Sequence, residues 1–135
     1  MREVIFASHG NFSEGIKDSV SMIIGEQSNV RSYQLKPGAS ATDFAEELQK
    51  EITENPETEY VILTDLYGAS VCSAMLPLTK NSNVHVFSGM NLVLALTVLL
   101  ETREPLNDEI ISEILNEAKE GIRLVKMEDI REEDF

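Results

Sequence analysis

Short segments that favour strands alternate along this chain with longer segments of helical periodicity, and this alternation constrains the fold most. Strands are expected at residues 4–7, 30–35, 60–64 and 84–87. The first and third are apolar throughout or nearly so, as is typical of strands buried on both faces of a sheet. Strands and helices alternating at this spacing predict an α/β fold with a doubly wound, mainly parallel open sheet.

Helices are expected between and after these strands. Their apolar stripes fall within residues 16–24, 42–52, 70–76, 92–100 and 110–118. Gly25 and Gly121 are placed to end the first and last of them, and Pro77 to kink or end the third. Residues 1–127 are therefore expected to form one domain, followed by an acidic tail at 128–135.

Charge and composition exclude several classes of protein. Eleven Lys plus Arg against 24 Asp plus Glu give a formal charge of −13 over 135 residues, without a basic cluster. Such a chain lacks the electrostatic footprint of nucleic-acid or anionic-membrane binding. One cysteine excludes a disulfide framework and a multi-thiolate zinc site. No apolar stretch is long enough for a membrane span, so a cytoplasmic domain is expected.

Polar, glycine-containing loops follow three of the expected strands. They are the segments 8–10 (Ser-His-Gly), 65–70 (Asp-Leu-Tyr-Gly-Ala-Ser) and 88–91 (Ser-Gly-Met-Asn). Ligands of open parallel sheets bind beyond the carboxyl ends of the strands, so these loops are expected to share one functional edge.

The residue pattern alone slightly favours a capping or packing histidine at His9, but its position favours a nucleophile or general base. It follows a buried strand and precedes Gly10, which permits close approach of another molecule. A phosphoryl group on His9 would meet helix-start N–H groups near Asn11. Two histidines without an H-E-x-x-H spacing give no metal site, and His85 inside its strand is interpreted as structural.

Asp65 either caps the helix near Ser70 or orients His9. In the second interpretation its carboxylate accepts a hydrogen bond from one ring nitrogen, fixes the tautomer and leaves the other lone pair free. The hydroxyls of Ser70 and Ser88 are candidate donors to phosphate oxygens, or else cap and turn residues. No nucleotide-binding glycine motif is present, so nucleotide binding lacks support.

At these residues the chain resembles the enzyme IIA domain of the mannose/fructose/sorbose family of the bacterial sugar phosphotransferase system. Four ordered features over residues 4–125 carry the likeness. They are Ser8-His9-Gly10, the segment 22–27 followed by Pro37-Gly38, the loop 65–70 and the segment 88–92. The family's usual Gly-Gly-Ser-Pro-x-Asn loop is altered at residues 68–73, which bears on partner docking more than on phosphorylation.

The resemblance implies that His9 accepts a phosphoryl group from the carrier protein HPr and passes it to an enzyme IIB, which serves sugar uptake through membrane permease subunits. Asp65 matches the family's supporting carboxylate. No cofactor is consumed, because the phosphate derives from phosphoenolpyruvate. The alternatives are the related phosphotransferase subunit of a dihydroxyacetone kinase and a regulatory α/β interaction module without chemistry.

Residues 122–127 alternate apolar and polar side chains enough to form a fifth, C-terminal edge strand. An unpaired edge invites pairing with another chain. The resembled family forms dimers that exchange C-terminal strands, so a homodimer with an exchanged strand is expected.

Overall fold

The fold is built on a four-stranded parallel sheet, seen in a computed structural model that describes residues 1–129. The strands are β1 (Arg2–His9), β2 (Val30–Leu35), β3 (Glu59–Thr64) and β4 (Val84–Phe87). Their order is β2-β1-β3-β4, and every neighbouring pair is parallel. The expected strands and the parallel α/β class are confirmed. The order changes direction between β1 and β3, where open sheets of this kind place their ligands.

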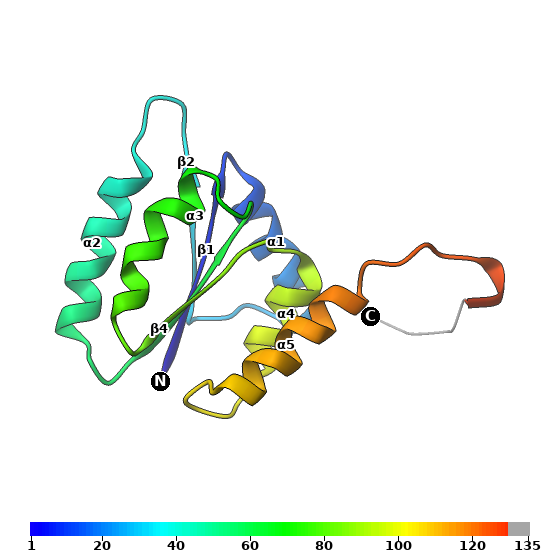
Figure 1. Ribbon diagram of the computed structural model, residues 1–135. Helices are drawn as coiled ribbons and strands as arrows, with labels where there is room; N and C mark the ends of the chain where they lie inside the picture. The colour runs from blue at the N-terminus through cyan, green and yellow to red at the C-terminus, as the bar shows by residue number, and fades with distance from the viewer. Residues whose placement is uncertain (130–135) are drawn as a thin grey trace.

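Helices cover both faces of the sheet. They are α1 (Phe12–Ile24), α2 (Ala41–Glu54), α3 (Ser70–Met75), α4 (Leu92–Leu100) and α5 (Asp108–Glu120), with short 3₁₀ turns η1 (Leu76–Lys80) and η2 (Met127–Asp129). Figure 1 shows α2 and α3 on one face and α1, α4 and α5 on the other, so the sheet is doubly wound as predicted. The helix expected from residue 70 ends before Pro77 and continues as η1.

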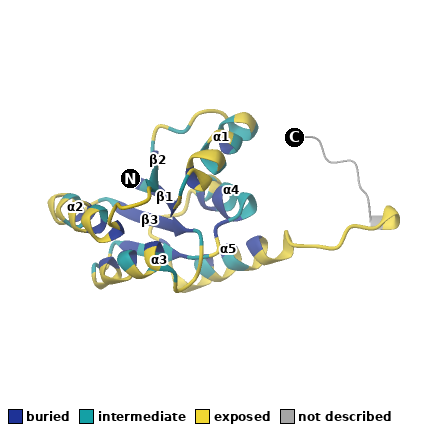
Figure 2. Cartoon of the chain, turned by 90° about the horizontal axis from the view of Figure 1, so that it is seen from above, coloured by how far each residue is buried: buried dark blue, intermediate teal, exposed yellow. Residues whose placement is uncertain are grey.

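Alternate residues of β1 enter two separate cores. Val4 and Phe6 pack with α1, α4 and α5, whereas Ile5 and Ala7 pack with α2 and α3. All four are completely buried, and the sheet lies as a buried layer between exposed helix faces (Figure 2). A strand buried on both sides has its register fixed, because a shift by one residue would move every side chain to the opposite core.

A buried ion pair closes the amino-terminal edge of the sheet. Arg2 and Glu59 are each 7% exposed, and Arg2 Nε lies 2.7 Å from Glu59 Oε1. The same guanidinium donates to the backbone carbonyls of Glu101 and Arg103, and Glu59 Oε2 accepts from the Leu106 amide at 2.7 Å. This cluster ties the starts of β1 and β3 to the connection between α4 and α5.

The expected fifth strand at residues 122–127 is wrong for the chain taken by itself. No strand is assigned over 122–126, and η2 begins at Met127. The segment leaves α5 and runs away from the sheet (Figure 1), so no strand edge of its own chain lies beside it. Strand exchange needs a second chain and stays a prediction. Residues 130–135 of the expected acidic tail lie outside the described residues.

Replacing Glu59 with alanine should destabilise the fold strongly, because the Arg2 guanidinium would stay buried without its counter-ion. Breaking a buried pair from one side costs about 3–5 kcal/mol. Urea unfolding of Glu59→Ala measures this loss, and Glu57→Ala, which removes an exposed carboxylate two residues away, is the matched control. A loss below about 1 kcal/mol, the range of surface pairs, would contradict the importance of the cluster.

Candidate functional site: a histidine held by a carboxylate at the switch point

His9 and Asp65 meet at the carboxyl edge of the sheet, at its switch point. His9 is the last residue of β1, and Asp65 directly follows β3, the strand paired with β1. The pairing brings Ala7 opposite Thr64. Two residues 56 positions apart in sequence therefore become neighbours because their strands are adjacent and parallel.

Asp65 holds His9 through both its backbone and its ring. Oδ2 of Asp65 accepts from the His9 backbone N–H at 2.8 Å and lies 2.8 Å from Nδ1 of the ring. The other oxygen, Oδ1, accepts from the Leu66 amide at 2.9 Å. Both carboxylate oxygens are thus engaged, and the sequence alternative of a helix cap is wrong, since the N-cap of α3 is Ala69 and makes no side-chain bond.

These contacts keep Asp65 ionised. Partial burial by itself favours the neutral acid, but the hydrogen bonds from the His9 backbone, the His9 ring and the Leu66 amide outweigh it, so the pKa of Asp65 lies below its ordinary 3.8. An ionised carboxylate can only accept, so Nδ1 carries the proton in this arrangement. The lone pair of the ring is then on Nε2.

Nε2 of His9 points to the first residue of α3. Its partner is Ser70 Oγ at 3.0 Å, and because Nε2 is the acceptor, the hydroxyl donates. The His9 side chain is 46% exposed. Nε2 is thus oriented by Asp65 through the ring and hydrogen-bonded by Ser70, on a half-exposed side chain that a group presented by another molecule can reach.

Three of the remaining predicted residues lie differently. Gly10 adopts a positive φ of 55°, but its N–H donates to the Leu35 carbonyl and is not free. Asn11 is the N-cap of α1 without a side-chain cap bond, and its Oδ1 accepts from Lys36 Nζ at 2.9 Å. Ser88 follows β4, one strand beyond β3, and no hydrogen bond joins it to His9 or Asp65 among residues 1–129.

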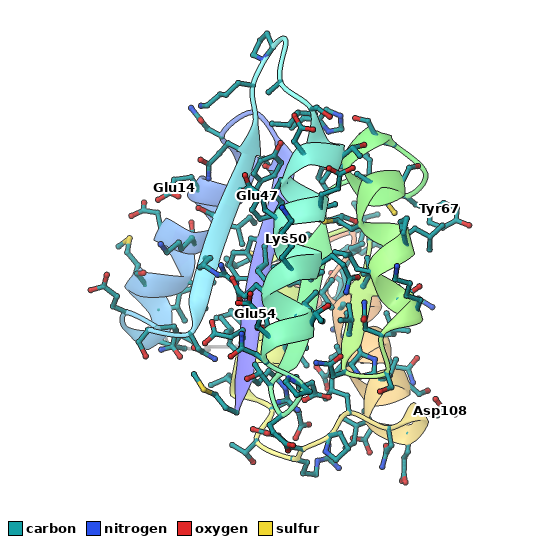
Figure 3. The ribbon with its side chains drawn as sticks, turned by 90° about the vertical axis from the view of Figure 1, so that its left-hand side faces the viewer. Glu14, Glu47, Lys50, Glu54, Tyr67 and Asp108 are labelled. Carbon is teal, nitrogen blue, oxygen red and sulfur yellow. The ribbon has the colours of Figure 1, made fainter. Side chains whose placement is uncertain are left out.

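Four other polar or reactive side chains make no hydrogen bond to His9 or Asp65 within residues 1–129. His85 lies at the opposite edge, with Nε2 3.3 Å from Glu59 Oε2, which agrees with its structural interpretation. Ser73, inside α3, donates to the Gly68 carbonyl, and Cys72 is half-buried. Tyr67, 89% exposed, projects away from the protein (Figure 3). Over residues 1–129, no group of three His, Cys, Asp or Glu side chains could hold a metal ion.

Sequence reasoning missed two buried hydroxyls beneath the site. Ser8 and Ser13 are each 0% exposed, and the Ser13 amide donates to Ser8 Oγ at 2.7 Å. Free amides were expected at the helix start near Asn11, but the amide of Ser13 already donates to Ser8 Oγ. A spacing of five residues matches no capping motif, so the only signal was a hydroxyl at the end of a buried strand.

The lowered pKa of Asp65 makes part of the stability depend on pH. Because the folded pKa is below the unfolded one, this contribution is fully present above about 3.8 and is lost as the pH falls through the folded value. Asp65→Asn should therefore unfold at lower urea than the wild type at pH 7, and the difference should shrink in acid. The exposed Asp18→Asn is the control for one lost charge, and a pH-independent gap at Asp65 would contradict the linkage.

Comparisons with known proteins identify the family of this chain. Residues 3–115 match the family model described as the PTS system fructose IIA component. The sorbose-specific EIIA component of Klebsiella pneumoniae is 35% identical over 100 residues, which cover 73% of each chain. The mannose-specific EIIAB component of Escherichia coli K12 is 25% identical over 126 residues, covering 91% of this chain but only 39% of that protein.

The fold agrees with solved structures as well. The crystal structure of the phosphotransferase system component EIIA from Streptococcus agalactiae matches with a TM-score of 0.81 and 29% identity, covering 91% of this chain and 96% of that one. No helix over residues 1–129 is long and apolar enough to cross a membrane. By sequence and by fold, the chain belongs to the enzyme IIA family of the mannose, fructose and sorbose phosphotransferase systems.

Proposed function

We propose that this chain is a cytoplasmic phosphocarrier that takes a phosphoryl group from phospho-HPr onto His9 and gives it to an enzyme IIB for sugar uptake. The observation that carries the proposal is the pair of contacts on the His9 ring. Asp65 holds Nδ1 at 2.8 Å, so the lone pair of the half-exposed ring lies on Nε2, next to the Ser70 hydroxyl. Membership of the enzyme IIA family supports the donor and the acceptor.

The transfer is a displacement at phosphorus. The Nε2 lone pair of His9 forms the new N–P bond while the N–P bond to the phosphohistidine of HPr breaks, and its electron pair returns to the donor nitrogen. The His9 ring becomes positively charged as the bond forms, and the ionised Asp65 beside Nδ1 stabilises that charge. The same steps in reverse deliver the phosphoryl group to enzyme IIB.

Ser70 has to change its hydrogen bond during this reaction. In the free protein its hydroxyl donates to Nε2 at 3.0 Å. Once Nε2 is phosphorylated it has no lone pair, so the hydroxyl turns to a phosphoryl oxygen. Ser70 therefore covers the lone pair of the empty carrier and binds the phosphoryl group of the loaded one. Ser88, without a hydrogen bond to His9, is left to act only in a complex with a partner.

The net charge of −13 favours a basic partner. The family resemblance implies that HPr is a small protein with a basic patch around its phosphohistidine. Long-range attraction between that patch and this acidic chain would raise the rate at which the two proteins meet. Membrane permease subunits would be reached through enzyme IIB rather than bound through this chain's own surface.

Replacing His9 with alanine should abolish phosphorylation and leave the fold intact. The side chain is 46% exposed, and a change at such a position costs at most about 1 kcal/mol. The measurement is phosphate incorporation after incubation with phosphoenolpyruvate, enzyme I and HPr, with acid lability identifying a phosphohistidine. His85→Ala is the matched control and should be phosphorylated normally.

Undiminished phosphohistidine in His9→Ala would refute the assignment. A wild-type chain that stays unphosphorylated would instead favour a regulatory interaction module. If the wild type is phosphorylated, adding a cognate enzyme IIB or the subunits of a dihydroxyacetone kinase separates the two carrier functions by the acceptor that removes the phosphate.

We also infer a homodimer in which residues 122–127 join the sheet of a second copy. Ile122, Leu124, Val125 and Met127 are between 70% and 85% exposed, an unusual run of apolar side chains in solvent. Within the described residues β4 pairs only with β3, so one edge of β4 is open to another strand. The exposed apolar segment lacks a surface that buries it, and the open strand edge has unpaired backbone N–H and C=O groups. Pairing the two between chains would satisfy both.

Removing the chain after Gly121 should weaken or abolish the dimer, because the exchanged strand contributes burial only in the assembly. Sedimentation of the full and shortened chains over a concentration range measures this. A shortened chain that dimerises with unchanged affinity would take the segment out of the interface. A full chain that is monomeric at high micromolar concentration would remove the dimer.

A further inference from the structure

Two buried hydroxyls support the turn that carries His9, and no step of the proposed transfer uses them. Ser8 and Ser13 are both 0% exposed. Ser8 Oγ accepts from the Ser13 amide at 2.7 Å and donates to the Gly10 carbonyl at 3.3 Å. These bonds cross the segment between β1 and α1, so they enclose His9 within a small hydrogen-bonded loop.

Ser8 supplies the cap that α1 otherwise lacks. The N-cap residue Asn11 makes no side-chain cap bond, and its Oδ1 is engaged by Lys36. The first amides of a helix have no intrahelical acceptor and need one from elsewhere. Ser8 Oγ meets this need for Ser13, whose own hydroxyl donates to the Tyr33 carbonyl of β2 at 2.8 Å. The start of α1 is thus fixed to β1 and β2 together.

Ser8 and His9 are successive residues with contacts on opposite faces of the sheet. The Ser8 side chain reaches the start of α1, whereas the His9 ring reaches Asp65 and Ser70 around the start of α3. The peptide between them is therefore held from both sides. Asp65 holds the His9 amide and ring, and Ser8 holds the turn that follows.

We propose that Ser8 is a positioning residue for His9, acting through its hydrogen bond to the Ser13 amide; this inference deepens the proposed function and rests on it. Without the Ser8 hydroxyl, the buried Ser13 N–H has no acceptor. A buried unpaired donor is unfavourable, so the start of α1 shifts to find water or another acceptor. Gly10 moves with it, and the His9 ring leaves its alignment with Asp65.

Three substitutions at one position separate hydrogen bonding from packing. Ser8→Ala removes the hydroxyl, Ser8→Cys keeps a side chain of similar shape with a weak acceptor, and Ser8→Thr keeps the hydroxyl. Since a misplacement of 1 Å can cost about 10²-fold in rate, the alanine and cysteine variants should accept phosphate from HPr about 10- to 100-fold more slowly. The threonine variant should stay within about 3-fold of the wild type by the same geometric argument.

Val98→Ala is the control for a merely destabilised chain. Val98 belongs to α4, and its side chain is 1% exposed in the core between α4 and the sheet. It forms no side-chain hydrogen bond, so truncating it should lower stability and leave the transfer rate unchanged. All variants are compared at a temperature where each is fully folded. If Ser8→Cys transfers at the wild-type rate, or Val98→Ala slows transfer as much as Ser8→Ala, the proposal is overturned.

A second measurement does not need phosphorylation. Nitrogen-15 NMR of the His9 ring reports the tautomer, and the Nδ1–H form should dominate in the wild type and Ser8→Thr but become mixed in Ser8→Ala and Ser8→Cys. An unchanged ring signal in all variants would overturn the positioning inference. If instead the wild type is never phosphorylated while the ring signals change as expected, the proposed function fails and the positioning of His9 stands.

Discussion

The parallel pairing of β1 with β3 is the constraint on which the rest of the molecule depends. These two central strands are buried on both faces, so their residues are shared between two cores and their register cannot shift without exchanging them. The register that packs the cores is also the one that brings His9 beside Asp65. Stability and chemistry are thus set by the same backbone hydrogen bonds.

Charged groups at the two ends of the strands differ in how far they are buried. At the amino-terminal edge, Arg2 and Glu59 form a buried pair with every polar atom engaged, which favours a single arrangement of the surrounding loops. At the carboxyl edge, Asp65 is tightly bonded while the His9 ring is nearly half exposed. In the proposed function the carboxyl edge carries the reacting atom, and the hydrogen bonds that already hold the ring reduce the reorganisation that the transfer requires.

Several hydrogen-bonding side chains hold His9 or the turn that follows it. Asp65 acts directly on the ring, Ser70 faces the reactive nitrogen, and Ser8 with Ser13 fixes the turn from the opposite face. In the proposed function the phosphoryl group is bound reversibly, so orientation of the nucleophile would matter more than a deep binding cavity. Tyr67, in the loop between Asp65 and Ser70, is 89% exposed.

The sequence by itself determined the four strands of the sheet, its five helices and its parallel class, and it made His9 and Asp65 candidate site residues, because apolar periodicity and strand-end glycines are local signals. Only the tertiary structure decided that Asp65 binds His9 rather than capping α3, since strand pairing selects which loop residues meet. Within residues 1–129 it shows no hydrogen bond from Ser88 to either residue, although β4 lies beside β3. It also showed that Ser8 caps α1 across five residues. Residues 122–127 have the alternating pattern of a strand but form no strand. An alternating pattern makes a segment suited to pairing, but a strand forms only where another strand lies beside it.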